Sequence, residues 1–175
     1  NVTRTGGTGP PVAHGANQVS NATTDASGEA TVPRIVVGNY RLRLSAPGYK
    51  PVTRQIIIVE GENSENVSLT PILADLVVSV RSSAGDAATG GAAVRNAEVN
   101  VTGERGGGSG TTSERGTVRI RGLRAGVYQV EASAERFLPG EAEATVRVGS
   151  PTATEPLVNN VTVRLAPAPV SLTLR

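Results

Sequence analysis

Few side chains in this chain are of the types that perform acid–base or nucleophilic chemistry. There is a single histidine, His14, and there is no cysteine. A nucleophilic triad needs a base, and His14 lies in a Pro- and Gly-containing stretch with no Asp nearby in the sequence. A solvated loop histidine is the favoured interpretation. We therefore expect no catalytic residues and no enzymatic activity.

Two short motifs resemble ligand sites but lack part of the chemistry that such sites require. Asp25, Ser27 and Glu29 suggest a calcium turn, yet a hard cation takes about six to eight oxygen ligands and this stretch offers few. A hairpin turn closed by the Asp25 side chain is favoured instead. The run Gly106–Gly110 lacks the Lys-Ser/Thr pair and the helix of a phosphate-binding loop, which favours a flexible hairpin tip. No metal and no cofactor are expected.

Asparagines in the N-glycosylation motif Asn-x-Ser/Thr are more frequent than the Ser and Thr content alone would produce. They are Asn1, Asn21, Asn66, Asn100 and Asn160. Two interpretations stay open. The motif marks covalent glycans on an extracellular face, or it reflects a β-rich chain that is rich in Thr and Ser.

The elements that would position any such groups must be built mainly from aliphatic residues. Hydrophobic residues make up 38% of the chain, and only four of them are aromatic: Tyr40, Tyr49, Tyr128 and Phe137. We expect these rings to anchor the cores, with a tyrosine hydroxyl reaching a backbone partner where the ring is buried. Because there is no cysteine, disulfides cannot contribute.

The charge and hydropathy patterns argue against a nucleic-acid partner and against membrane insertion. The net charge is only +2 and the charges are scattered, which is typical of a solvated surface and not of a nucleic-acid interface. No apolar run approaches the ~20 residues of a membrane helix, so no membrane insertion is expected. Arg115, Arg119 and Arg121 form an outward stripe at strand spacing. A solvated face is the default for it; contact with a neighbour's Glu or with a sugar is the alternative.

An internal repeat organises the chain. Gly28, Gly38, Tyr40 and Tyr49 recur at Gly116, Gly126, Tyr128 and Phe137, each with an offset of 88 residues. Six residues are then inserted in the second copy, and from Asn66 and Asn160 onward the sequence gives an offset of 94. With that offset Leu76–Arg81 corresponds to Val170–Arg175. At the other end, Asn1-Val-Thr matches Asn100-Val-Thr102.

The local patterns are those of strands and turns. Tyr40–Ser45 alternates between apolar and polar residues. Gln55–Val59 is β-branched and is predicted to be buried on both faces. Further strands are expected at Leu76–Val80, Thr117–Ile120, Val127–Ala132, Ala144–Val148 and Val161–Leu165. Loops are expected at Gly6–Ser20, Ala84–Arg95 and Gly103–Gly110. Many short strands with such turns predict an all-β sandwich or barrel.

The stretch from Thr24 to Tyr49 resembles the carboxypeptidase regulatory-like domain. It carries Thr24-Asp25-x-x-Gly28, then Gly38-x-Tyr40-x-Leu42, then Gly48-Tyr49. The second copy keeps this skeleton, except that Ser113 replaces the Asp and Arg136 the Gly before the ring. The resemblance covers nearly the whole chain. It implies tandem transthyretin-like, Ig-like sandwiches of about seven strands, in a structural or adhesive family without catalytic residues.

The repeat predicts three parts: an incomplete sandwich module lacking its first strand at 1–73, a complete module at 74–168, and a C-terminal donor strand at 169–175. The last part presents Val170, Leu172 and Leu174 on one face. Donation of this strand to the open edge and apolar groove of the next copy would build a head-to-tail homopolymer. The leading hypothesis is therefore a self-assembling subunit of an extracellular filament.

Two alternatives belong to other functional classes. The chain is a stalk or adhesin segment of a longer cell-surface protein whose further strands lie outside it. Or it is a non-catalytic accessory module of a secreted enzyme, which the scarcity of aromatic residues for sugar stacking disfavours.

Overall fold

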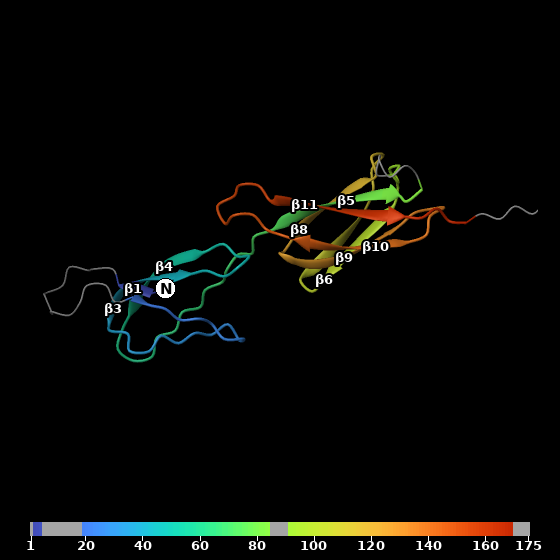
Figure 1. The fold of residues 1–175 in the computed structure, drawn as a ribbon. Helices are drawn as coiled ribbons and strands as arrows, with labels where there is room; N and C mark the ends of the chain where they lie inside the picture. Colours follow the sequence, from blue (N-terminus) through green and yellow to red (C-terminus); the bar gives the residue numbers. More distant parts are fainter. Residues whose placement is uncertain (1, 5–18, 85–90, 170–175) are drawn as a thin grey trace, which may run out of the picture. The chain divides into compact units, whose positions relative to one another are not determined.

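The structure is a computed structural model that describes residues 2–4, 19–84 and 91–169. The chain divides into two compact units, Asn1–Thr70 and Pro71–Arg175. The described residues form strands, turns and irregular segments, which confirms the all-β class (Figure 1). Each unit is described here by itself.

Unit 2 contains two sheets that share one hydrophobic core. The first has the strand order β10 (Gly140–Val146), β9 (Gly126–Ser133), β6 (Glu98–Gly103) and β7 (Gly106–Thr111). The second has the order β11 (Leu157–Leu165), β5 (Ala74–Ser82) and β8 (Thr117–Leu123). Alternating apolar positions of both sheets point inward, as expected for a sandwich. They include Leu76, Val78, Val99, Val101, Ile120, Val130, Val146 and Val163.

Strand β5 is the centre of the second sheet. It runs parallel to β11 and antiparallel to β8, and Figure 1 shows it beside both. Ala74, Leu76, Val78 and Val80 are each 0% exposed, because alternate residues of a central strand all face the core. The aliphatic, β-branched sequence of this strand suits that position.

Unit 1 contains one four-stranded sheet in the order β2 (Val19–Ser20), β1 (Val2–Arg4), β3 (Gly38–Leu44) and β4 (Val52–Ile58). This order matches β7-β6-β9-β10 of unit 2. The register matches as well, since Val2 pairs with Leu42 as Val101 pairs with Val130. The first sheet is therefore present in both repeats.

The second sheet has no counterpart among the described residues of unit 1. Residues 29–35, which correspond to β8, form no strand, and neither do residues 63–70, which correspond to β11. No described residue of unit 1 occupies the place that β5 holds in unit 2. Residues 29–35 and 63–70 are called the flanking segments below.

Three expectations about local structure are wrong. The end of the loop expected at Gly6–Ser20 is a strand, because Val19–Ser20 forms β2 and pairs with β1. The glycine-rich run is not a flexible tip, because Gly106–Thr111 forms β7 and pairs along its length with β6. A Cβ added at Gly107 would collide with the Val101 carbonyl, so glycine here permits close packing and not mobility. Strand β4 is not buried on both faces, because Ile57 is 72% exposed.

The offset of the repeat in its last part also needs correction, from 94 to 96 residues. Asn63 bonds both backbone polar groups of Val59, as Asn159 bonds both of Arg147. Lys50 N donates to Thr70 O as Leu138 N donates to Ala166 O. Thr70 therefore corresponds to Ala166, and the C-terminal residues 170–175 correspond to 74–79 of β5. The similarity of Asn66-Val-Ser to Asn160-Val-Thr is not a structural equivalence.

Candidate functional site

The flanking segments of unit 1 carry apolar side chains that are only partly covered. Val32 and Ile35 are half-buried, as are Val67 and Leu69. Their equivalents in unit 2 are all buried, at 5% exposure or less: Ile120, Leu123, Val163 and Leu165. In unit 2 these side chains belong to β8 and β11 on either side of β5. Within residues 20–70, Tyr40 is the one buried residue.

The first flanking segment forms no strand but shares one backbone feature with β8. In unit 2 the β5–β8 register shifts between Ala74 and Leu76, and Gly122 at this bulge has φ of 74°. Arg34, at the equivalent position, has φ of 58°. A non-glycine residue rarely adopts this left-handed conformation. Unit 1 therefore has the left-handed conformation of the β8 bulge position, at a residue type that rarely adopts it.

The turn before this segment is also conserved between the repeats. Gly28 N donates to Asp25 O as Gly116 N donates to Ser113 O. The predicted Asx turn is present, since Asp25 Oδ1 accepts from Ser27 N, Ser27 Oγ and Glu29 N. The Ser27 hydroxyl first, and then the Glu29 amide, lower the pKa of Asp25 below its ordinary value of 3.8.

Each unit has one buried tyrosine in the first sheet, Tyr40 in unit 1 and Tyr128 in unit 2. Tyr40 and Tyr128 are each 1% exposed. The Tyr40 hydroxyl donates to Val36 O at 2.7 Å, and the Tyr128 hydroxyl donates to Arg124 O at 3.0 Å. This is the backbone partner expected for a buried phenol. Tyr49 and Phe137 are half-buried, and Phe137 packs against the core of unit 2.

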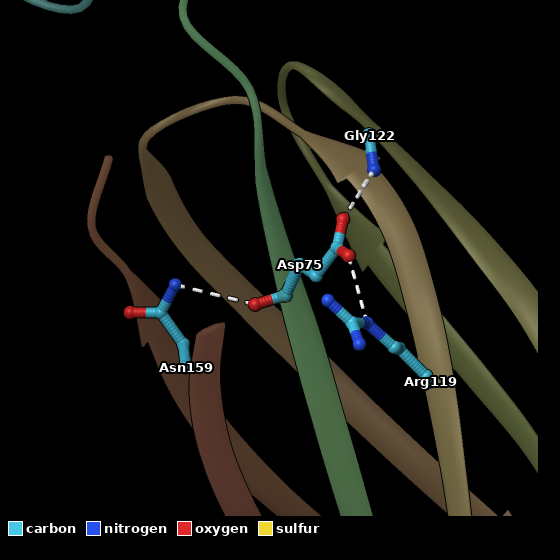
Figure 2. A network of polar contacts seen from close by, with 4 residues as sticks. All are labelled: Asp75, Arg119, Gly122 and Asn159. Atoms are coloured by element: carbon cyan, nitrogen blue, oxygen red, sulfur yellow. Dashed lines mark hydrogen bonds and ion pairs between the residues drawn. The ribbon is translucent and has the colours of Figure 1, made fainter. Parts of the chain in front are cut away.

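A polar network in unit 2 fixes one end of β5. The Asp75 side chain is 6% exposed and pairs with Arg119 Nε at 2.8 Å. Its other oxygen accepts from Gly122 N at 3.3 Å, and its backbone carbonyl accepts from Asn159 Nδ2 at 3.3 Å. Figure 2 shows the carboxylate directed toward Arg119 and Gly122, and the carbonyl toward Asn159.

The sequence interpretation missed this network. Asp75 stands in an otherwise apolar strand, Ala74–Val78, and a charge in a buried strand needs a partner. The position of Asp75 in this apolar strand is thus a sequence signal for a buried polar network. The partner of Asp75 is Arg119. The strand spacing predicts a solvated side chain for Arg119, as for Arg115 and Arg121, so the ion pair does not follow from the sequence pattern.

Several predicted site residues lie outside the described part of the chain. These are the donor-strand positions Val170, Leu172 and Leu174 and the asparagine Asn1. His14, which is expected to be a solvated loop residue, also lies outside the described part. The four described asparagines of the glycosylation motif are all exposed: Asn21, Asn66, Asn100 and Asn160. Their exposure permits glycan attachment, and whether glycans are present stays a prediction.

Among residues 2–4, 19–84 and 91–169, no group of three or more His, Cys, Asp or Glu side chains is placed to hold a metal ion. In this part of the chain no helix has the length and apolar character needed to cross a membrane.

The sequence model of the carboxypeptidase regulatory-like domain matches residues 7–71 and again residues 79–167. The chain belongs to this family. The two matches confirm two tandem copies of the carboxypeptidase regulatory-like domain. A search of the curated proteins gave no match.

Solved structures of similar fold include a Bacillus anthracis protein and streptococcal pilus proteins. The Bacillus anthracis TIE protein is 20% identical with a TM-score of 0.57, over 86% of this chain and 28% of that one. The minor pilin GBS52 of Streptococcus agalactiae is 18% identical with a TM-score of 0.45, over 91% and 73% of the two chains. The group B streptococcus pilus 2b backbone protein is 13% identical with a TM-score of 0.43, over 80% and 52%. This chain thus spans little more than a quarter of the TIE protein, and the likeness concerns the fold.

Proposed function

We propose that this chain is a non-catalytic structural subunit of an extracellular filament. Each copy donates residues 170–175 to unit 1 of the next copy, where the donated strand takes the place of β5. The observation that carries the proposal is the pair of flanking segments. They keep the turn before β8, the left-handed conformation at its bulge position and the apolar residues of β8 and β11, but no described strand lies between them.

The sequence of the proposed donor strand fits this place. Val170, Leu172 and Leu174 correspond to Ala74, Leu76 and Val78 of β5, which are all 0% exposed. Insertion would bring three aliphatic side chains against Val32, Ile35, Val67 and Leu69. Each fully buried aliphatic side chain contributes about 1.5–3 kcal/mol.

The backbone of the donor strand would be satisfied at the same time. By analogy with β5, it would run parallel to residues 63–70 and antiparallel to residues 29–35. Both flanking segments would then gain ladder hydrogen bonds, as in other strand-addition complexes. Asn63 is placed as Asn159 is, so its amide would donate to the carbonyl of Ser171.

The contact joins two different surfaces of the subunit, so it propagates and does not close on itself. A cell-surface location agrees with this role. It also agrees with the four exposed asparagines of the glycosylation motif, which would carry covalent glycans there.

The test is deletion of Val170–Arg175 from the full chain. We expect the wild-type protein to form filaments visible by negative-stain microscopy, and the truncated protein to stay a folded monomer. Addition of a synthetic peptide of sequence 168–175 should then raise the melting temperature of unit 1, while the same peptide with Leu172→Asp should not.

Three outcomes contradict the proposal. They are filaments in the truncated protein, no filaments in the wild type, and a peptide that leaves unit 1 unchanged. If intact mass spectrometry of the native protein also shows a much longer chain, a stalk module completed by its own polypeptide takes the place of the filament subunit.

A further inference from the structure

The buried ion pair of unit 2 bears on which strand can enter which sandwich. Asp75 is 4% exposed as a residue, and its carboxylate is held by Arg119 and by Gly122 N beneath the β8 bulge. An ionised carboxylate in such a place is tolerated only with its partners, because the desolvation of an unpaired charge is strongly unfavourable.

Unit 1 lacks the cationic partner at the equivalent place. Thr31 stands where unit 2 has Arg119, and Arg34 stands where it has Gly122. Arg34 is exposed and already has an interaction with another group. Asn63 preserves the position of Asn159. Unit 1 therefore keeps the groups that would bind a strand backbone but not the guanidinium that neutralises Asp75.

The proposed donor strand differs from β5 at the matching residue. With the structural offset, Asp75 corresponds to Ser171. A serine hydroxyl opposite Thr31 can form a neutral hydrogen bond, whereas an aspartate there would bury a charge with no cation beside it.

We infer that the Asp75/Ser171 position determines which strand each sandwich accepts. This inference rests on the proposed function. Unit 1 accepts the serine-bearing strand 170–175 and rejects a β5 strand, whether from its own chain or from another copy. Unit 2 retains β5 through the Asp75–Arg119 pair. The two strand types are thereby sorted, and β5 cannot block the site at which a new subunit attaches.

The experiment places the charge in the donor strand of the full chain. Ser171→Asp should raise the critical concentration for polymerisation by roughly a hundred-fold or more, since an unpaired buried charge at an interface weakens binding at least to that extent. Ser171→Asn is the matched control, because it has nearly the same shape without the charge. It should stay within about ten-fold of the wild type.

Rescue distinguishes the charge from a simple disturbance of the strand. The double variant Thr31→Arg/Ser171→Asp restores the pair found in unit 2, and it should recover most of the lost affinity. Thr31→Arg alone, with Ser171 intact, should polymerise no better than the wild type.

The outcomes separate this inference from the proposed function. If the wild type forms no filaments, the proposed function fails. If the wild type polymerises and Ser171→Asp does so equally well, the sorting role is wrong and strand donation stands. Loss in Ser171→Asp without recovery by Thr31→Arg, or equal loss in Ser171→Asn, also overturns the sorting role.

Discussion

Truncation of a single donor-strand side chain gives a direct measure of strand insertion. Leu172 corresponds to Leu76, which is 0% exposed between β8 and β11. A buried Leu→Ala change costs about 2–5 kcal/mol. At about 1.4 kcal/mol per factor of ten, Leu172→Ala should raise the critical concentration roughly 30-fold to a few thousand-fold. The soluble fraction left after sedimentation of filaments measures this concentration.

The neighbouring residue provides the control for this experiment. Thr173 corresponds to Val77, which is only half-buried on the other face of the strand. Thr173→Ala should therefore shift the critical concentration by less than about ten-fold. Equal effects of Leu172→Ala and Thr173→Ala would refute the alternation on which the insertion geometry rests. So would a Leu172→Ala protein that polymerises like the wild type.

Three further predictions concern the two units themselves. Arg136 has φ of 67°, like Gly48 with 79°, so Arg136→Gly should stabilise unit 2 by about 1 kcal/mol in chemical denaturation. Gly107→Ala should destabilise the same unit by about 1–3 kcal/mol, because the added Cβ meets Val101 O, and a melting temperature equal to the wild type would contradict this. The lowered pKa of Asp25 means that its stabilising effect is present above pH 3.8 and is lost as the pH falls through the folded-state pKa. Asp25→Asn should therefore remove part of the acid dependence of unit 1 in thermal melts between pH 2 and 7.

All three strands of the second sheet, and β3, β4, β9 and β10 of the first, could be predicted from the sequence, for a local reason. Gly28, Gly38 and Tyr40 recur at a constant offset, and each specifies a turn or an inward ring by itself. The strands between them alternate with a period of two, so their inward faces follow from the same residues.

The features that could not be predicted from the sequence depend on contacts between residues distant in the chain. The glycines of β7 predict a flexible loop when the backbone they pack against is unknown. For this reason β7 was not predicted as a strand. The arginines at 115, 119 and 121 are predicted to be solvated, because the sequence does not show that Asp75 lies beside Arg119. These two residues are 44 positions apart in the chain. The predicted repeat offset of 94 residues was wrong because Asn66-Val-Ser is similar in sequence to Asn160-Val-Thr. The hydrogen bonds of Asn63 and Asn159 show that these two asparagines are the equivalent pair.

The offset of 96 residues preserves the inward face of the proposed donor strand. A shift of two residues leaves the faces of a strand unchanged, so Val170, Leu172 and Leu174 keep their inward assignment. The same shift makes Thr70–Ala74 and Ala166–Val170 equivalent connections of equal length. In the described chain, the strand that follows the last segment of unit 1 becomes the central strand of the next sandwich. Under the proposed function, the strand that follows unit 2 does the same in the next subunit.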